Sequence, residues 1–335
     1  MLKYALALCA ALAFSGCSQA PPESSNGSGE PPTLQLAGMG KSVHPFWEQV
    51  ELGMQAGSQT AGANVEFFVP SREDAKAQSE KLKSWVVAGK QGILFAASDP
   101  ETVGPAIRDA IARGIPCIAM DTDAPQSGRI AYVGTDNYAA GREAGKVLGQ
   151  ILQGRGKVCI ATGSLTAANS LERIKGFQDA LEEEYPGVVV LRDILVDNED
   201  RASAVQKAKA KLAAEPDISA FYGVYALNGP ACATAVESAG KTGQVKVVCF
   251  DTTAEHMNML KSGKIDAAIG QRPFLMGRIG VELLAAVIRD GAEKALVEAG
   301  AKDGKLDTGV DIVMQDTIEE YREKLKGLGI PVEGW

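Results

Sequence analysis

Two aspartates follow apolar, strand-like runs at corresponding places in two stretches of the chain. Asp121 ends the run in IARGIPCIAMDTDAP (111–125), and Asp251 ends the run in ESAGKTGQVKVVCFDTTAE (237–255). Both stretches have a helix end, a glycine, an apolar strand and then Asp-Thr. A carboxylate accepts hydrogen bonds from hydroxyl groups, and open α/β sheets bind ligands beyond the carboxyl ends of their strands. The repeat predicts two similar halves whose aspartates face one ligand cleft.

Aromatic side chains stand at a predicted helix start in His44-Pro45-Phe46-Trp47. Proline fits the first helical position, and a helix N-terminus leaves free N–H groups. Neighbouring residues on a helix point about 100° apart, so Phe46 and Trp47 cannot both face the same core. We expect one ring to be available to the cleft while the other packs inside; the alternative is that both belong to the core.

The chain lacks the motifs of common catalytic centres. Gly40-Lys41-Ser42 ends like a phosphate-binding loop, but that motif needs a glycine five residues earlier, where this chain has Gln35. No nucleophile elbow, paired-cysteine or calcium-loop pattern occurs. His44 and His256 are the only histidines, which argues against a multi-histidine metal site or a Ser-His-Asp centre. We predict no catalytic residue, no metal site and no cofactor.

Composition restricts the classes of partner. The 335 residues include 34 Lys and Arg against 42 Asp and Glu, so the net charge is −8. An acidic chain without a basic cluster argues against nucleic-acid binding. Apolar residues make up 45% and charged residues 23%, as in globular proteins, and at about 150 residues per domain this length suggests two domains.

The first residues are typical of an export signal. Lys3 precedes an apolar run of eleven residues from Tyr4 to Phe14, which is too short to span a bilayer. Ser15-Gly16 before Cys17 resembles a bacterial lipobox, so residues 1–16 are predicted to be a lipoprotein signal peptide with lipid on Cys17; a plain cleaved secretion signal is the alternative. Residues 17–32, rich in Pro, Gly and Ser, are predicted to be a flexible tether. The protein is therefore expected to be periplasmic or otherwise extracytoplasmic and anchored to a membrane by lipid.

Four further cysteines follow the predicted tether. Cys117, Cys159 and Cys249 lie inside apolar strand-like runs, which favours small buried side chains over metal ligands. For Cys232 the sequence leaves a disulfide open, because export implies an oxidising compartment, but spacing assigns no partner.

Short apolar runs alternate with segments of helical periodicity from Thr33 onward, which predicts an α/β fold with parallel sheets covered by helices. Strands are predicted at 34–39, 64–69, 92–96, 117–121, 130–134, 157–162, 188–196, 219–224, 245–250 and 266–270. Helices are predicted at 46–61, 73–89, 100–113, 138–153, 171–184, 201–214, 229–239 and 273–290.

Across residues 34–314 the order of motifs resembles the periplasmic sugar-binding proteins of ATP-driven importers, of the ribose/galactose type. The matching motifs are Pro45-Phe46-Trp47, the strand-ending Asp121, Val133-Gly134-Thr135-Asp136-Asn137, Gly141-Arg142 with Gly145, Glu172-Arg173 before Gly176-Phe177, Phe250-Asp251, and Ile269-Gly270-Gln271 before Pro273. Repressors of the LacI type share this core, but here an export signal stands in place of their DNA-binding head.

The resemblance implies a type I periplasmic binding protein fold, in which two similar doubly wound parallel-sheet domains are joined by a hinge of three crossings. Crossings near 135–137, 270–272 and 307–313 give one domain of residues 33–135 plus 272–308 and another of 136–271 plus 309–335. Closure about this hinge would trap the ligand.

The resemblance also implies a sugar site, because aromatic faces cover the C–H face of a sugar while carboxylates and amides bind its hydroxyls. Carried over by position, the ligand-binding residues would be His44, Phe46, Trp47, Asp121, Asn169, Tyr225, Asp251 and Gln271. Thr122, Glu199 and Asn228 are further candidates, and Asn228 could equally be a helix cap. Asp121 and Asp251 could each cap the following helix instead.

Departures from the ribose type concern the ligand. Thr122 and Leu171 stand where that type has arginine, His44 and Tyr225 where it has asparagine, and Glu199 where it has phenylalanine. The loss of two arginines argues against an acidic or phosphorylated ligand. The expected function is capture of a neutral monosaccharide or polyol for the permease of an importer by a monomeric binding protein that is not an enzyme. The alternative is a sugar or autoinducer sensor that signals through a chemoreceptor or sensor kinase.

Overall fold

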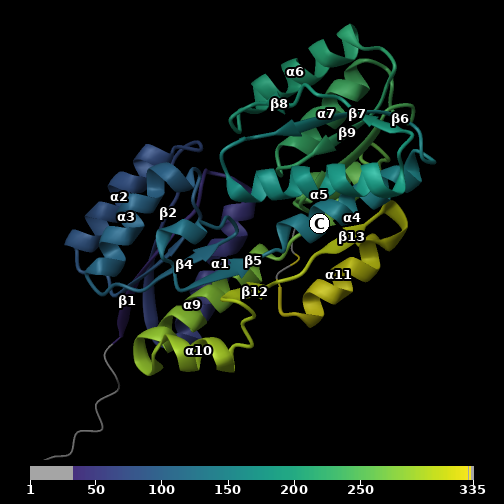
Figure 1. The fold of residues 1–335 in the computed structure, drawn as a ribbon. Helices are drawn as coiled ribbons and strands as arrows, with labels where there is room; N and C mark the ends of the chain where they lie inside the picture. The colour runs from purple at the N-terminus through teal and green to yellow at the C-terminus, as the bar shows by residue number, and fades with distance from the viewer. Residues whose placement is uncertain (1–32, 331, 333–335) are drawn as a thin grey trace, which may run out of the picture. The chain divides into compact units, whose positions relative to one another are not determined.

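The computed structural model describes residues 33–330 and 332, and these form one compact unit that begins at Thr33 (Figure 1). The predicted signal peptide, Cys17 and the predicted tether lie outside the described residues. Within them, no helix is both long enough and apolar enough to cross a membrane.

The first sheet has six parallel strands in the order β12-β5-β4-β3-β1-β2. The strands are β1 (Leu34–Met39), β2 (Ala63–Phe68), β3 (Gly92–Phe95), β4 (Cys117–Met120), β5 (Ala131–Gly134) and β12 (Lys305–Asp307). The helices packed with this sheet are α1 (Pro45–Ala61), α2 (Ala75–Val87), α3 (Pro100–Ala112), α9 (Pro273–Asp290) and α10 (Ala292–Glu298). Figure 1 shows α2 and α3 on one face and α1 and α9 on the other.

The second sheet follows the order β13-β11-β10-β9-β6-β7, with β8 also paired to β6. Its strands are β6 (Gly156–Thr162), β7 (Val188–Val190), β8 (Leu195–Val196), β9 (Ile218–Gly223), β10 (Lys246–Phe250), β11 (Ala267–Gly270) and β13 (Asp311–Val313). Its helices are α4 (Asn137–Ile151), α5 (Ala168–Glu184), α6 (Arg201–Ala214), α7 (Asn228–Ser238), α8 (Ala254–Lys261) and α11 (Ile318–Gly327). A parallel sheet was predicted, but β13 is antiparallel to β11, so this sheet is not wholly parallel.

Both sheets have the apolar character that a sheet with two covered faces requires. β3, β4, β5 and β11 are buried at every position, and separate groups of apolar side chains fill the space on each face of each sheet. The α/β prediction is confirmed. The predicted strand 188–196 is wrong as one element, because the chain breaks between β7 and β8, which pair with different parts of β6.

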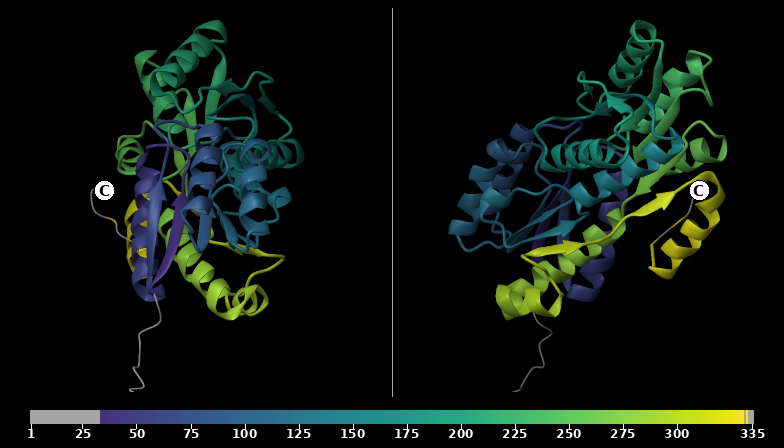
Figure 2. Two further views of the ribbon diagram at one scale, coloured as in Figure 1. Left: turned by 90° about the vertical axis from the view of Figure 1, so that its left-hand side faces the viewer. Right: turned by 45° about the vertical axis from the view of Figure 1, so that its right-hand side comes forward.

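The chain passes between the two sheets three times. It leaves β5 for α4, returns from β11 to α9, and leaves β12 for β13 (Figure 2). These crossings agree with the three-crossing hinge. The residue boundaries given above for the two domains remain a prediction.

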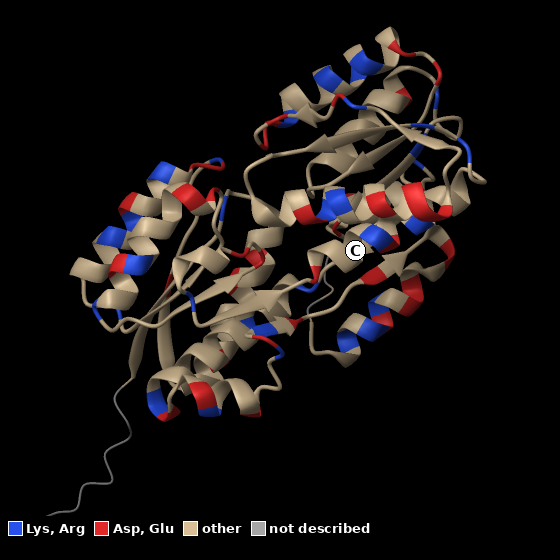
Figure 3. Ribbon diagram, viewed as in Figure 1, with Lys and Arg blue, Asp and Glu red and all other residues tan. Residues whose placement is uncertain are grey.

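The four cysteines after the tether are all buried and free, so within the described part of the chain Cys232 forms no disulfide. Acidic and basic side chains are mixed on most of the outer helices in Figure 3, whereas α6 carries basic side chains alone, at Arg201, Lys207, Lys209 and Lys211.

Candidate functional site

A cleft lies between the two sheets and leaves about 580 Å³ free of protein atoms, counting its mouth. It receives side chains from loops at the carboxyl ends of strands in both sheets. Of the candidate residues, the structure brings into its lining His44, Phe46, Trp47, Asp121, Asn169, Glu199, Tyr225, Asp251 and Gln271. Residues that sequence reasoning did not propose also line it: Lys41, Ser42, Val43, Ser71, Arg72, Arg173, Ala226 and Leu227.

Asp121 and Asp251 occupy equivalent places in the two sheets. The Asp121 N–H donates to the carbonyl of Val133 at 3.2 Å, and the Asp251 N–H donates to that of Ile269 at 2.8 Å, in each case on the adjacent strand. Both residues have left-handed backbone, with φ of 58° and 76°. Non-glycine residues adopt this conformation mainly where the surroundings enforce it, and it turns each carboxylate out of its strand into the cleft. Neither carboxylate caps a helix: α8 after Asp251 has no side-chain cap.

Asp251 belongs to a network of buried polar side chains at the hinge. Its Oδ1 accepts a hydrogen bond from Gln271 Nε2 at 2.8 Å. Gln271 Oε1 accepts from Arg173 Nη2 at 2.6 Å and from Thr135 Oγ1 at 2.9 Å. Burial raises the pKa of Asp251 to about 6, and the positive charge of Arg173 opposes that rise. Burial therefore leaves one carboxylate of the cleft with a pKa of about 6, although Arg173 and Gln271 favour its charged form.

Arg173 is held by more than Gln271. Its Nε donates to Asn137 Oδ1 at 2.9 Å, its Nη1 donates to the carbonyl of Val224 at 3.0 Å, and its guanidinium lies 4.0 Å from the centre of the Phe250 ring. The side chain is almost fully buried. Arg173 thus joins α5, the start of α4 and the end of β9 into one rigid wall.

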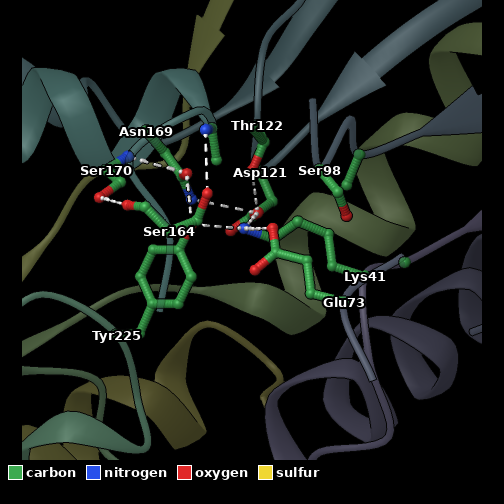
Figure 4. Close-up of polar contacts among 12 residues, drawn as sticks. Lys41, Glu73, Ser98, Asp121, Thr122, Ser164, Asn169, Ser170 and Tyr225 are labelled. Carbon is green, nitrogen blue, oxygen red and sulfur yellow. Dashed lines mark hydrogen bonds and ion pairs between the residues drawn. The ribbon is translucent and has the colours of Figure 1, made fainter. Parts of the chain in front are cut away.

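Lys41 lies at the centre of the opposite wall (Figure 4). Its Nζ donates to Tyr225 Oη at 3.2 Å and lies 3.9 Å from both Asp121 Oδ2 and Glu73 Oε1. Burial opposes the charge of Lys41, but Tyr225, Glu73 and Asp121 outweigh it, so the pKa of Lys41 is raised above its usual value. Burial likewise raises the pKa of Glu73 to about 7, and Lys41 limits that rise.

Asn169 connects the two walls. Its Nδ2 donates to Asp121 Oδ2 at 3.4 Å, and its Oδ1 accepts from Tyr225 Oη at 3.5 Å, as Figure 4 shows. The same Oδ1 accepts from the N–H of Ser170 at 2.9 Å, which orients the amide. A ligand in the cleft would therefore meet an acceptor-rich edge made by Asp121 and Asn169.

Phe46 and Trp47 both line the cleft, packed edge to face with ring centres 5.1 Å apart. The expectation that only one ring would be available is wrong: both are more than 90% buried in the domain and still border the cavity. The close approach of Gly40 makes room for Trp47, because a Cβ on Gly40 would lie 2.5 Å from the indole. His44 caps α1, since its Nδ1 accepts from the N–H of Phe46 at 3.2 Å, and burial lowers its pKa.

Two candidate residues do not line the cleft. The Thr122 hydroxyl donates to Asp121 Oδ2 at 2.6 Å and is buried behind it, so Thr122 supports a cleft carboxylate. Asn228 is buried as the first residue of α7 and caps nothing: its Oδ1 accepts from the N–H of Tyr225, and its Nδ2 donates to Asp197. Both alternatives considered for Asn228 are therefore wrong.

The residues missed from the sequence had weak signals. Lys41 belongs to the Gly40-Lys41-Ser42 stretch that resembles the end of a phosphate-binding loop, and its position in the loop after β1 equally suits a ligand role. Arg173 was part of the Glu172-Arg173 match, but only the folded chain shows that its side chain turns inward to Gln271. Among the described residues no three His, Cys, Asp or Glu side chains gather in a way that could hold a metal ion.

A profile of the periplasmic binding protein domain family matches residues 39–294 of this chain. Among curated proteins, the ribose import binding protein of Haemophilus influenzae is 27% identical over 71% of this chain and 80% of its own length. The D-ribose/D-allose-binding protein of Pseudomonas aeruginosa is 26% identical over 91% of this chain and 97% of its own length.

Solved structures of sugar-binding proteins are also similar to this chain. The glucose-galactose binding protein of Geobacillus stearothermophilus is 30% identical with a TM-score of 0.79, over 86% of this chain and 99% of that one. A transporter solute-binding protein of Burkholderia graminis, in complex with D-arabinose, is 30% identical with a TM-score of 0.80, over 86% of this chain and 97% of that one. Similarity of this extent covers both sheets and the cleft between them.

Proposed function

We propose a sugar-receptor function from one premise, that this chain belongs to the periplasmic binding protein domain family. It captures a neutral monosaccharide or polyol in the cleft between its two sheets and delivers it to the permease of an ATP-driven importer. It binds its ligand and does not transform it. Relatives named for ribose, allose, glucose-galactose and arabinose support this class of ligand.

The observation that carries the proposal is the pair of strand-ending aspartates in one cleft with two aromatic rings. Asp121 comes from the first sheet and Asp251 from the second, and Phe46 and Trp47 border the same cavity. Carboxylates accept hydrogen bonds from sugar hydroxyls, and aromatic faces cover the apolar C–H face of the ring. Because the two aspartates belong to different sheets, a sugar that binds both favours the closed state of the hinge.

The balance of charge in the cleft favours a neutral ligand. Lys41 already faces Asp121 and Glu73, and Arg173 is hydrogen-bonded to Gln271 and to two groups of the protein. Arg72 also lines the cleft, but it is exposed. An acidic sugar in the buried part of the cleft would need a cation that is not already matched by protein groups, because a buried charge is costly unless it is paired. Hydroxyl groups need no such compensation.

We also propose where in the cell the protein acts and in which oligomeric state. Extracytoplasmic location fits relatives named as periplasmic or import binding proteins, and a lipid on Cys17 would hold the receptor at the membrane next to its permease. We propose that the protein acts as a monomer, since both lobes must be free to close and to present their surfaces to the permease.

The test is a thermal-shift screen of the protein from residue 18 against neutral monosaccharides, polyols and nucleosides. Asp251→Ala serves as the site variant, and Asp316→Ala, an exposed aspartate away from the cleft, is the matched control. We expect a stereochemically selective rise in Tm that Asp251→Ala abolishes and Asp316→Ala keeps. A wild-type protein that responds to no member of the panel would contradict the proposal, as would a shift that Asp251→Ala retains.

The sensor alternative makes a different prediction in cells. If the protein serves an importer, its deletion stops uptake of the radiolabelled ligand that the screen identifies. If uptake continues while the response to the sugar is lost, the receptor signals and does not transport.

A further inference from the structure

We infer that Asp197 and Asn228, which do not reach the cleft, set its sugar selectivity by fixing the positions of Glu199 and Tyr225. This inference rests on the proposed function. Glu199 and Tyr225 lie on different loops, after β8 and after β9, and both line the cleft. Asp197 and Asn228 join these loops through the hydrogen bond from Asn228 Nδ2 to Asp197 Oδ2 at 2.6 Å.

Asp197 holds the Glu199 loop in a conformation that side chains rarely adopt. Asn198 and Glu199 both have left-handed backbone, with φ of 56° and 58°. Asp197 Oδ1 accepts a hydrogen bond from the N–H of Glu199 at 2.9 Å, which closes a turn of the kind that aspartate favours. The backbone of Asp197 and Asn198 is also bonded to Thr162 and Gly163. This turn directs Glu199 into the cleft, and it depends on the Asp197 carboxylate.

Asn228 does the same for the Tyr225 loop. Its Oδ1 accepts from the N–H of Tyr225 at 2.7 Å, while its Nδ2 is already committed to Asp197. Both side chains are almost fully buried. Asp197 therefore binds the Glu199 loop through Oδ1 and Asn228 through Oδ2, while Asn228 binds the Tyr225 loop through Oδ1 and Asp197 through Nδ2. A shift of either loop must therefore move the other.

Gly163 completes the arrangement from a third loop. A Cβ on Gly163 would lie 2.5 Å from the Tyr225 ring and 3.0 Å from Cγ of Glu199. Real Cβ atoms essentially never lie as close as 2.5 Å to another atom, and 3.0 Å is an unusually tight contact, so both side chains pack directly against the glycine. Glu199 and Tyr225 are thus confined between the Gly163 loop on one side and the hydrogen bonds from Asp197 and Asn228 on the other.

The functional consequence concerns which sugars fit. A site that hydrogen-bonds a hydroxyl discriminates strongly against an epimer that places it elsewhere, because a buried polar group is then left unpaired. Such discrimination needs the protein groups to be held within a fraction of an ångström. A loosened Glu199 and Tyr225 should lower affinity for the best ligand more than for its epimers.

The pair can be inverted, which gives a sharp test. In the double variant Asp197→Asn with Asn228→Asp, the new amide donates to the new carboxylate, and both backbone N–H groups keep an acceptor. Either single change leaves two like groups facing each other. Asp200→Asn is the matched control: Asp200 is exposed and caps α6, and asparagine caps helices equally well.

The measurement is isothermal titration calorimetry with the sugar that gives the largest wild-type thermal shift and with one of its epimers. We expect each single variant to lose at least about tenfold in affinity for the sugar and to narrow the ratio between the two ligands, and the inverted pair to return within about threefold of wild type. Single variants that fold but keep both the affinity and the ratio would overturn the inference. So would an inverted pair that folds without recovering them.

Two further results keep the outcome clear. If a single variant does not fold, the inverted pair and Gly163→Ala provide the test. The inverted pair must keep the wild-type ratio of affinities for the two sugars. Gly163→Ala, which displaces Glu199 and Tyr225, must change that ratio. A changed ratio in the inverted pair or an unchanged one in Gly163→Ala overturns the inference. Failure of the proposed function is recognised separately, because the wild-type protein would then bind no sugar at all.

Discussion

The cleft has a first-sheet wall with Lys41, Ser42 and Asp121 and a second-sheet wall with Arg173, Asp251 and Gln271, and different interactions hold the two walls. In the second-sheet wall, Arg173, Gln271 and Asp251 are joined by hydrogen bonds of 2.6–2.8 Å, and Asp197 and Asn228 add another of 2.6 Å. In the first-sheet wall, Lys41 lies 3.9 Å from each of its two carboxylates, and the short hydrogen bond to Asp121, 2.6 Å from the Thr122 hydroxyl, comes from behind the wall. The Ser42 hydroxyl, buried in the lining, has no hydrogen-bond partner among the described residues.

The difference suggests that the walls have different tasks. Short, directional hydrogen bonds fix side chains in advance and cost nothing when a ligand arrives. Charges at 3.9 Å attract one another but leave donors and acceptors available for ligand hydroxyls. We therefore expect changes in the second-sheet wall to lower stability as well as affinity, and changes in the first-sheet wall to act mainly on affinity.

The largest effect is expected for Arg173→Met. Its removal leaves Asn137, the Val224 carbonyl and Gln271 buried without their donor. Hydrogen bonds to a charged group contribute about 1.5–3 kcal/mol each, but removing the buried cation also removes its desolvation cost, so the free energy of unfolding should fall by about 3–5 kcal/mol. Urea denaturation measures this loss. Lys175→Met, on the exposed face of the same helix, is the control and should change stability by under about 0.5 kcal/mol.

Lys41→Met tests the first-sheet wall. The cleft loses a donor to the ligand, and Asp121 and Glu73 lose their cation, so affinity should fall by about tenfold to a hundredfold. Stability should change less than in Arg173→Met, because Glu73, with a pKa of about 7, can take up a proton when the cation is gone. Calorimetry and urea denaturation on the same samples measure both. A loss of stability as large as that of Arg173→Met would remove the distinction between the walls.

Sequence patterns located the residues that point outward from the strands better than those that support them. The strand-ending aspartates, the aromatic pair and Gln271 carry local signals, and the structure places Asp121, Asp251, Phe46, Trp47 and Gln271 at the cleft. The supporting roles of Arg173, Asp197 and Asn228 depend on partners that are 98 and 31 residues away in the chain, so the local sequence does not reveal these roles. Thr122 was expected in the cleft because it stands at a strand end, which the local sequence indicates. Which of the strand-end side chains turns into the cleft is decided only in the folded chain.

The fold was predictable because burial on both faces leaves long apolar runs, and β3, β4, β5 and β11 show such runs. The break between β7 and β8 could not be predicted, since both strands are rich in branched apolar residues and only their pairing with different parts of β6 separates them. The antiparallel β13 is three residues long, too short to give an alternation pattern.

Asp251 provides a test in which affinity and stability move in opposite directions. Its pKa of about 6 in the folded state lies above the 3.8 of an unburied aspartate, so the folded state binds a proton more readily than the unfolded state. This group therefore adds stability as the pH falls from about 6 to 4. The protonated carboxyl is a poorer acceptor for sugar hydroxyls, so affinity should fall about tenfold between pH 7 and pH 5.

Calorimetry at several pH values, with Asp251→Asn as reference, checks both effects. The variant should bind more weakly at pH 7 and show a flatter pH profile, and the difference in Tm between the two proteins should shift in favour of wild type as the pH falls. An equally steep affinity profile in Asp251→Asn would assign the titration to another group, with Glu73 and Asp197, each with a pKa of about 7, the candidates.

The smallest effect is expected for Thr122→Val, which removes one hydroxyl behind the first-sheet wall and keeps the shape of the side chain. The Thr122 hydroxyl donates to Asp121 Oδ2 at 2.6 Å, and Asn169 and Lys41 reach the same oxygen from 3.4 and 3.9 Å. Without the hydroxyl, Asp121 keeps weaker contacts and can rotate, so affinity should fall about twofold to tenfold, the equivalent of one hydrogen bond. Thr122→Ser keeps the donor and should recover most of the affinity, measured by calorimetry under the same conditions. If Thr122→Val instead lowered Tm as strongly as Arg173→Met and left affinity unchanged, the first-sheet wall would be as rigid as the second, and the contrast between them would not hold.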